Sequence, residues 1–498
     1  MNVLNPSFPP GIRKIPAFAA LLAMFALVFG ALQAAPVYQG NGIKIGEVTA
    51  DSAIVWTRLT IAPEGNWSGA AFIEPVLPEG QKPGLGNFDW RVQLPKGRTV
   101  ADMAGALPGA AGEVRVTLKS AADGAPLVKP WTPVRAQRDF TQQFEFAKLR
   151  AGTRYEVTVE SRDPAGAAGA TVRGAFRTAP AADAVAPVNF AVVTCGDYPR
   201  RDDPANGHKI YASMRRLAPD FMVHTGDVEY YDKADPWANS PVLARFKWNR
   251  IYALPFQREF HRETAAFFMY DDHDILRNDC WPGMTFGELT FDEGVKIFHE
   301  QTPSGPAPYR TVRYGRDLQI WIVEGRVARS ANTDPDGPNK TIWGAAQKAW
   351  FYKTVAASDA TFKVVLTPTP IVGPDRGTKN DNLANEGFKT EGNEIRKFVG
   401  AQPNMVVITG DRHWQYHSVD PKTGTREFGC GPSSDVHAGG YSPQPGDEAV
   451  QKFFRLKGGF ITVLVERKAG APVMLVRHHD VDGSVVLATP IAPAKVAR

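Results

Sequence analysis

The sequence predicts an α/β fold of layered sheets and helices that is preceded by an all-β segment. From about residue 188 onward, strand-like hydrophobic runs alternate with amphipathic helical patterns, which is the βαβ signature of a layered α/β domain. Between about residues 37 and 180, short runs of alternating polarity are separated by Pro- and Gly-rich turns, a pattern typical of a β-sandwich. The length of 498 residues with 43% hydrophobic residues permits two or more domains with large cores.

Residues 1–35 have the composition of an export signal. Arg13 and Lys14 precede an uncharged run over residues 15–32 that is rich in Ala, Leu and Phe. An uncleaved N-terminal anchor is the alternative, because this run is near the lower length limit for a membrane span. The segment contains no twin arginine, so we expect export of the unfolded chain to the periplasm or the medium, with metals bound afterwards. We expect no other membrane span.

The charge of the chain is nearly balanced. The formal net charge is +5. Removing Arg13 and Lys14 of the predicted export signal leaves 55 basic residues (57 minus 2) against 52 acidic ones. This balance argues against a nucleic-acid-binding surface or an anionic membrane as partner.

The predicted β-sandwich over residues 37–180 contains a long insertion at residues 60–135. Its clearest strand is TRYEVTVES, in which Tyr155, Val157 and Val159 share one face. The insertion is rich in Pro and Gly and contains candidate strands at residues 88–94 and 113–119. A linker-like segment follows at residues 177–187.

The predicted catalytic domain covers residues 188–490. Apolar residues at helical spacing predict helices at residues 208–218, 343–358 and 394–399. Further strands are expected at residues 318–325 and 361–367. Three runs near the C-terminus predict antiparallel strands that complete a second sheet: 458–468, 471–479 and 484–490.

Four hydrophobic runs end in acidic or metal-binding residues, and they organise this domain. The runs end in the motifs CGD at Asp197, GDVEY from Asp227, DDHD from Asp271 and GDRH from Asp411. In a parallel sheet such strand ends lie on one edge, where ligand sites form. Carboxylates crowded there repel each other unless cations lie between them, so the pattern predicts a metal centre.

The candidate metal ligands combine hard oxygen, imidazole nitrogen and thiolate donors. They are Asp197, Asp227, Asp272, Asp411, His413 and Cys195. Such a mixed set favours one iron or zinc ion together with harder partners. Tyr230 offers a phenolate that favours ferric iron, although a packed loop aromatic is the alternative. Asp227 or Asp411 could bridge two metals about 3.5–4 Å apart.

His273 is the candidate general acid for the leaving group. Its neighbours Asp272 and Asp274 are expected to raise the imidazole pKa and keep the ring protonated. A third metal ligand or a structural histidine is the alternative.

Taken together, these motifs resemble the PhoD-like alkaline phosphatases of the metallophosphoesterase superfamily. The resemblance spans about residues 37–480 and is carried by SAIVWTRL, Cys195 to Asp197, Asp227 to Tyr230, Asp271 to His273, and Asp411 to His413. It implies hydrolysis of phosphate esters, with ferric iron and calcium as metals. The implied fold is a two-sheet sandwich flanked by helices, after a fibronectin-like β domain.

The resemblance also implies roles for individual residues. Cys195 and Tyr230 would be iron ligands, and Asn278 would reach the calcium side. Zinc or manganese is the alternative metal. Active-site arginines would bind phosphate oxygens in bidentate fashion, and the candidates are Arg326, Arg329 and Arg412, each of which could also be a surface residue.

The leading hypothesis is a phosphomonoesterase with some phosphodiesterase activity, acting on small-molecule or polymer phosphate esters. One alternative is a dedicated phosphodiesterase that cleaves phospholipid or cell-wall polymer. Another is a catalytically silent binding protein. The argument against this alternative is that none of the expected metal ligands is replaced by an apolar residue. In an oxidising compartment Cys280 and Cys430 could form a disulfide.

Overall fold

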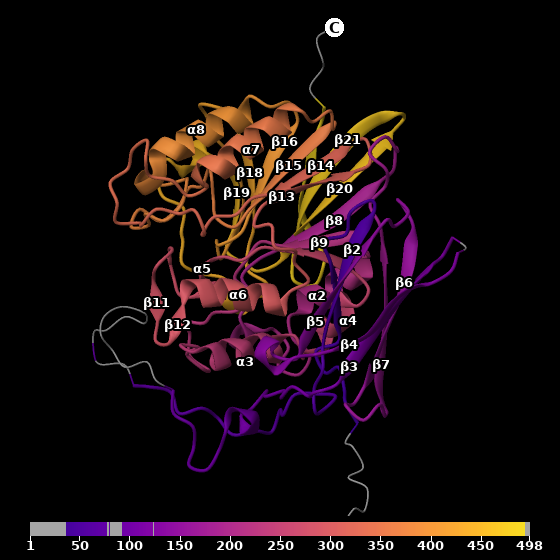
Figure 1. Ribbon diagram of the computed structural model, residues 1–498. Coiled ribbons are helices and arrows are strands. Elements are labelled where there is room, and N and C mark those ends of the chain that lie inside the picture. The colour runs from indigo at the N-terminus through magenta and orange to yellow at the C-terminus, as the bar shows by residue number, and fades with distance from the viewer. Residues whose placement is uncertain (1–35, 77–78, 80–91, 123, 494–498) are drawn as a thin grey trace, which may run out of the picture.

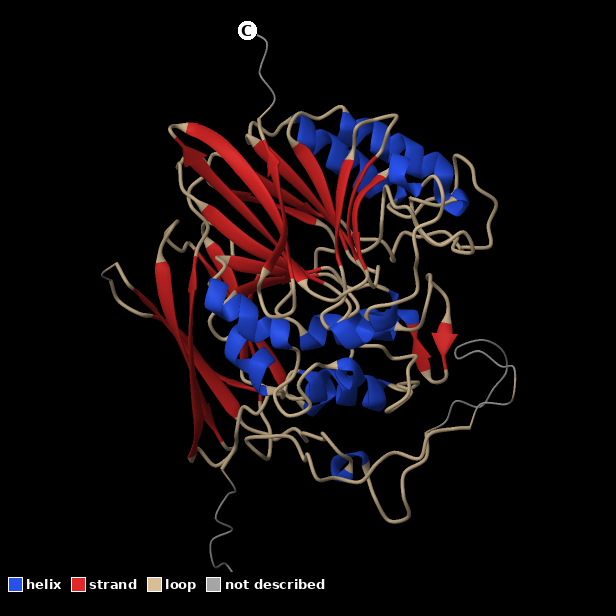
Figure 2. Ribbon diagram, turned by 180° about the vertical axis from the view of Figure 1, so that it is seen from behind, coloured by secondary structure: helices blue, strands red, loops and turns tan. Residues whose placement is uncertain are grey.

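The computed structural model describes residues 36–76, 79, 92–122 and 124–493 (Figure 1). The predicted export signal and most of the candidate strand at residues 88–94 lie outside these residues. Two large β-sheets pack face to face, and helices cover their outer faces (Figures 1 and 2). The predicted α/β architecture is therefore confirmed, while the fibronectin-like classification of the first segment stays a prediction.

The first large sheet has nine strands that come from both ends of the chain. In spatial order they are β22 (Val485–Ile491), β21 (Ala471–His479), β20 (Phe460–Lys468), β8 (Val188–Val193), β9 (Phe221–His224), β10 (Ala265–Phe268), β1 (Ile43–Gly46), β2 (Ser52–Arg58) and β5 (Thr141–Ala147). Strands β8, β9 and β10 are parallel, and β1 runs parallel to β10 through the pair Gly46 and Ala266. The N-terminal strands thus continue the sheet of the predicted catalytic domain.

The second large sheet has seven strands, and two smaller sheets complete the strand inventory of the described residues. The seven are β13 (Arg310–Tyr314), β14 (Leu318–Ile322), β15 (Phe362–Thr367), β16 (Met405–Thr409), β18 (Arg426–Cys430), β17 (Gln415–Val419) and β19 (Gln451–Arg455). The others are β4 (Leu127–Pro133), β3 (Glu113–Ser120), β6 (Arg154–Arg162) and β7 (Ala168–Arg177), and the hairpin β11 (Thr285–Phe286) and β12 (Leu289–Thr290).

The assignment of the C-terminal strands to the second sheet is wrong. They are antiparallel as predicted, but β20 pairs with β8 and so extends the first sheet. Strand β20 is buried along most of its length, and this pattern alone does not specify which sheet receives it.

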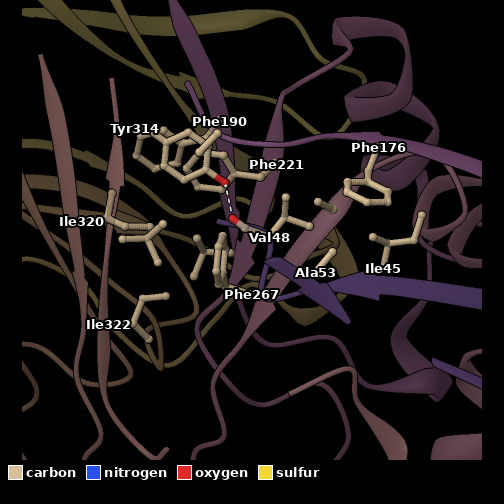
Figure 3. Packing of buried hydrophobic residues seen from close by; sticks show 14 of the residues in the cluster. Ile45, Val48, Ala53, Phe176, Phe190, Phe221, Phe267, Tyr314, Ile320 and Ile322 are labelled. Carbon is tan, nitrogen blue, oxygen red and sulfur yellow. Dashed lines mark hydrogen bonds between the residues drawn. The ribbon is translucent and has the colours of Figure 1, made fainter. Parts of the chain in front are cut away.

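The core between the two large sheets follows from the alternation of side chains along the strands. Phe190 of β8 and Phe221 of β9 face inward and stack with ring centroids 4.8 Å apart, and Tyr314 of β13 stacks on Phe221 at 4.3 Å (Figure 3). The Tyr314 hydroxyl donates to the carbonyl oxygen of Val48, 3.1 Å away. The neighbouring residues in β8, such as Ala191, face outward under the helices.

The helices pack against the outward-facing side chains of the two large sheets. They are α2 (Lys209–Leu217), α3 (Pro241–Ile251), α4 (Pro255–His261), α5 (Asp272–Ile275) and α6 (Phe291–Gln301) beside the first sheet, and α7 (Gly344–Ala356) and α8 (Lys389–Gly400) beside the second. Short 3-10 turns are η1 (Val100–Asp102), η2 (Ala136–Arg138), η3 (Tyr198–Arg200), η4 (Glu386–Phe388), η5 (Asp435–His437) and η6 (Asp447–Ala449). The predicted α2, α7 and α8 are confirmed, and no helix of the described residues has the length and hydropathy needed to cross a bilayer.

The C-terminal end of α6 is capped by side chains from the N-terminal strands. Lys44 Nζ donates to the carbonyl of Gln301 at 2.6 Å, and the Trp56 indole donates to that of Glu300 at 2.8 Å. Gln143 donates to the carbonyls of His299 and Thr302. These bonds satisfy carbonyl groups that have no partner inside the helix, so β1, β2 and β5 fix the position of α6.

All three cysteines are buried free thiols. The disulfide considered between Cys280 and Cys430 is therefore not formed in this structure.

Candidate metal and catalytic site

The four predicted strand ends meet, but they come from two sheets. Strands β8, β9 and β10 lie in the first sheet and β16 lies in the second, which corrects the expectation of a single sheet edge. The backbone N–H of Asp411, after β16, donates to the Thr194 hydroxyl at the end of β8, 3.3 Å away. The facing of the two sheets therefore brings the GDRH segment onto the other three motifs.

Four of the predicted ligands have a left-handed backbone conformation. Their φ angles are 50° at Cys195, 73° at Asp197, 59° at Asp227 and 63° at Asp411. Residues other than glycine seldom adopt this region, which costs of order 1–3 kcal/mol when the surrounding structure enforces it. The chain thus turns sharply just after β8, β9 and β16.

The first group of donor atoms combines a thiol, a carboxylate, an imidazole and a phenol. Atoms of Cys195, Asp227 and His413 lie within 4.8 Å of one another. The Tyr230 hydroxyl lies 3.1 Å from Asp227 Oδ2 and 3.2 Å from His413 Nε2. Burial, followed by the Asp227 charge, raises the pKa of both Cys195 and Tyr230 well above its usual range. A multivalent cation would offset this penalty, so the donor set suits a metal that binds thiolate and phenolate.

Two further groups share Asp227 and consist mainly of carboxylates. One contains Asp227, Asp271 and Asp411, and the other contains Asp227, Asp272 and His273, each with atoms within 4.8 Å. The buried Asp227 Oδ1 has no hydrogen-bond partner among the described residues, which fits an oxygen that would ligate a cation. Asp271 was not predicted as a ligand, although it lies in the same DDHD motif as Asp272.

Asp197 and Asn278 lie at the margin of these groups. Asp197 Oδ2 is 3.3 Å from Arg200 Nε, and its buried Oδ1 has no hydrogen-bond partner among the described residues. Asn278 is exposed, and its backbone N–H donates to Asp232 Oδ2 at 2.9 Å. Their metal-ligand roles therefore stay predictions.

His273 is held by Asp232, which the sequence reasoning missed. The distance from His273 Nδ1 to Asp232 Oδ1 is 2.5 Å. Burial lowers the pKa of His273, but the charges of Asp232 and then Asp272 and Asp227 outweigh it and raise the pKa to about 10. Asp232 stands five residues after Asp227, where the sequence offers no hint of this contact.

Asp274 binds backbone groups, whereas it was expected to raise the pKa of His273. Its carboxylate accepts the backbone N–H groups of Asp227 and Val228 at 2.5 and 2.7 Å, and those of Glu229 and Asp271 at 3.2 and 3.0 Å. Asp274 therefore organises the loops after β9 and β10, whereas Asp232 is the carboxylate that contacts His273.

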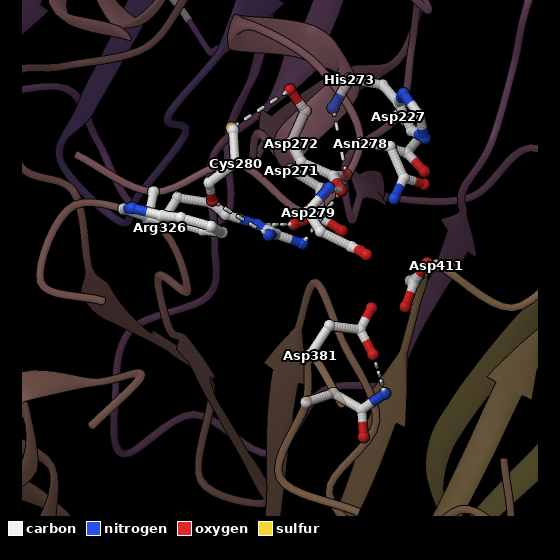
Figure 4. A network of polar contacts seen from close by, with 12 residues as sticks. Asp227, Asp271, Asp272, His273, Asn278, Asp279, Cys280, Arg326, Asp381 and Asp411 are labelled. Carbon is white, nitrogen blue, oxygen red and sulfur yellow. Dashed lines mark hydrogen bonds and ion pairs between the residues drawn. The ribbon is translucent and has the colours of Figure 1, made fainter. Parts of the chain in front are cut away.

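The three predicted arginines are buried and bind protein groups. Arg326 Nε lies 2.5 Å from Asp271 Oδ1, and its Nη2 lies 3.5 Å from Asp272 Oδ2 (Figure 4). Burial raises the pKa of Asp272, but the charges of Arg326 and His273, together with the backbone N–H of Asp279, outweigh it and hold this pKa below its usual range. Figure 4 also shows Asp411 on the opposite side of the site from Arg326.

Arg329 and Arg412 are likewise engaged. Arg412 Nη2 lies 2.6 Å from Asp375 and 2.9 Å from Asp411, and Arg329 contacts Asn332 and the carbonyl of Asp381. These contacts show arginines that orient carboxylates and loops. Their binding of phosphate oxygens stays a prediction.

A second histidine, His437, completes the surroundings of the first group. Its Nδ1 lies 3.2 Å from the carbonyl oxygens of both Cys195 and Gly196, so this nitrogen carries the proton. Its Nε2 is buried without a partner among the described residues, and its ring centroid lies 4.2 Å from that of His413. No motif marks His437 in the sequence, because it follows a Gly- and Ser-rich loop.

The chain is similar in sequence and in fold to known proteins. Residues 190–455, more than half of the chain, match the family described as PhoD-like phosphatase. Alkaline phosphatase D of Bacillus subtilis (strain 168) is 23% identical over 310 residues, which are 52% of this chain and 52% of the relative. The match therefore covers about half the length of that curated relative.

Two solved structures share the fold. One, described as the structure of PhoD, has a TM-score of 0.67 at 16% identity and covers 93% of this chain and 90% of that one. The other is the purple acid phosphatase PPD1 from yellow lupin (Lupinus luteus) seeds, with a TM-score of 0.59 at 11% identity, over 90% of this chain and 74% of that one. The family match covers more than half of the chain, including the strands that carry the motifs. The chain therefore belongs to the PhoD-like phosphatase family.

Proposed function

We propose that this chain is a metal-dependent phosphoric ester hydrolase, acting chiefly on monoesters and more slowly on diesters. The observation that carries the proposal is the sharing of Asp227 by three donor groups beside the His273–Asp232 pair. A carboxylate common to adjacent groups can bridge two metal ions, the arrangement that many phosphate-cleaving enzymes use. Membership of the PhoD-like phosphatase family supports the same chemistry.

The donor types suggest which metals the site would hold. Cys195, Tyr230, His413 and Asp227 would hold ferric iron, and the carboxylates of Asp227, Asp271, Asp272 and Asp411 would hold calcium. Zinc or manganese is the alternative. Bound ions would supply Lewis acidity that lowers the pKa of water and polarises the phosphoryl group.

His273 is the proposed general acid. Asp232 fixes the ring through Nδ1, so its orientation does not depend on substrate. A protonated imidazole held in this way can transfer its proton to the alkoxide oxygen as the ester bond breaks. Arg326 keeps the adjacent carboxylates oriented while this happens.

The leader supports a location outside the cytoplasm. Residues 1–35 combine a basic start with an uncharged apolar run, which is the composition of an export signal. The substrates proposed are therefore phosphate esters of the periplasm or the medium.

The test compares wild type and His273→Ala on an alkyl phosphate and on an aryl phosphate with an acidic phenol. A good leaving group departs without a proton, so the variant should lose about 10²–10⁴-fold on the alkyl ester and much less on the aryl ester. Elemental analysis should find unchanged metal content. Equal losses with lost metal would make His273 a ligand, and faster cleavage of diesters than monoesters by wild type would favour a dedicated phosphodiesterase.

A further inference from the structure

The loop between β9 and α3 carries three residues of the site, Asp227, Tyr230 and Asp232, and is held from both sides. On its inner side, the Lys247 ammonium donates to the carbonyl of Tyr230 at 2.5 Å and to that of Lys233 at 3.2 Å. Asp232 in the same loop binds His273 and the backbone N–H of Asn278. A shift of this loop would therefore move both the Tyr230 phenol and the carboxylate that orients His273.

On its outer side, the loop is bound by a residue of the insertion at residues 60–135. The half-buried carboxylate of Glu74 accepts the backbone N–H of Asp235 at 3.0 Å with one oxygen and that of Trp237 at 3.4 Å with the other. These are contacts across more than 160 residues of sequence. A carboxylate that accepts two backbone N–H groups fixes the turn between them.

Glu74 is itself fixed in place on the surface of α3. The Phe72 ring packs edge-on against Phe246 of α3, with centroids 5.1 Å apart and an interplanar angle of 80°. The neighbouring Ile73 exchanges two backbone hydrogen bonds of 3.0 Å with Gln93. The two residues that directly precede Glu74 are thus anchored, one by ring packing and the other by backbone hydrogen bonds.

A second contact from the insertion reaches the same loop through Arg250 of α3. The buried Arg250 guanidinium donates to the carbonyl of Asp235 and lies 3.2 Å from its carboxylate. Gly105 of the insertion covers this side chain so closely that an added Cβ would lie 2.4 Å from Arg250 Cδ. Two separate points of the insertion therefore bear on Asp235.

We propose that Glu74 is a positioning residue through which the insertion fixes the loop bearing Tyr230 and Asp232. Glu74 is not a member of the donor groups and would act through its hydrogen bonds to the Asp235–Trp237 turn. Its consequence for catalysis rests on the proposed function, whereas its consequence for the loop and for metal retention does not. The insertion then stabilises, from outside the site, the position of the loop that carries Tyr230 and Asp232.

The experiment compares Glu74→Gln with the matched control Glu64→Gln, an exposed carboxylate of the same insertion. An amide offers one acceptor oxygen where the carboxylate offers two, so one backbone N–H of the turn loses its partner. Hydrogen exchange followed by mass spectrometry should show faster exchange over residues 232–240 in Glu74→Gln alone. Metal loss into excess EDTA should accelerate by about tenfold, and kcat for an aryl phosphate should fall by a similar factor, since misplacement by 1 Å can cost about 10²-fold.

Three results would overturn the proposal. They are unchanged exchange over residues 232–240, faster exchange with unchanged metal loss and kcat, and equal effects in the Glu64 control. Glu74→Asp, which keeps both oxygens but is one methylene shorter, should recover part of the metal retention and provides a second variant if Glu74→Gln folds poorly. If wild type cleaves no phosphate ester, the proposed function fails, but exchange and metal loss still decide the role of Glu74.

Discussion

Replacing Gly294 by alanine should disturb the site through the contact between α6 and α5. An added Cβ at Gly294 would lie 1.7 Å from the carbonyl oxygen of Ile275 and 2.5 Å from its carbonyl carbon. Ordinary contact begins near 3.4 Å, so the helices must separate by about 1.7 Å (3.4 minus 1.7) along this direction. Both obstructing atoms belong to the backbone, so no side chain can rotate away.

The displacement reaches the chemistry because α5 is a single turn. Ile275 lies two residues after His273 and three after Asp272. Misplacement of catalytic groups by 1 Å can cost about 10²-fold, so kcat/KM for an aryl phosphate should fall by about that factor or more. Overpacking should cost about 1–3 kcal/mol of unfolding free energy, against a gain of about 1 kcal/mol from the better helix propensity of alanine.

The assay pairs kcat/KM with thermal unfolding, and Gly305→Ala is the control. An added Cβ at Gly305 meets nothing within 4 Å, so this variant should keep both the rate and the unfolding midpoint. If Gly294→Ala retains wild-type kcat/KM, the helices can separate without moving His273 and Asp272, and the reasoning is wrong.

Three further predictions concern the metals and the buried lysine. Cys195→Ala should lower both bound iron and the hydrolysis of a chromogenic phosphate ester while near-UV circular dichroism stays unchanged; full metal content and rate would make Cys195 structural. A calcium-selective chelator should abolish activity, with calcium restoring it better than zinc because oxygen ligands dominate the set, and restoration by zinc alone would indicate a two-zinc site. Burial, followed by the charge of Arg58, lowers the pKa of Lys44 well below 10.5, so the unfolded chain binds more protons between the folded-state pKa and 10.5. The unfolding free energy from denaturant titration should therefore rise with pH over that window by up to about 1.4 kcal/mol per unit, and Lys44→Met should remove this rise; an identical slope in both proteins would contradict the assignment.

The sequence predicted that the four motifs follow strands and lie close together. It could do so because each strand is a hydrophobic run that stops at a polar turn. Donor atoms of Cys195, Asp227, Asp272, His273, Asp411 and His413 do meet in the three groups. The residue types and their order along the chain indicated that these residues meet, although they come from two facing sheets and not from one sheet edge.

What the sequence did not predict are partnerships between distant segments. A buried strand such as β20 has the same appearance whichever sheet it joins, so its pairing with β8 was missed. Asp232 and His437 carry no motif, and their roles follow from loops that meet only in three dimensions. Arg326 lies in the site as expected, but only the structure shows that it is held by Asp271 and Asp272.

The pairing of β1 with β10 has a consequence for biosynthesis. Gly46 and its partner Ala266 are 220 residues apart (266 minus 46), so β1 is made long before its neighbour in the sheet exists. At about 5–20 residues per second, translation alone separates the two strands by about 10–45 s. During that interval β1, β2 and β5 can pair with one another but present an open edge, which is a template for pairing with other chains. A chaperone that covers this edge until β10 is made would therefore limit pairing with other chains.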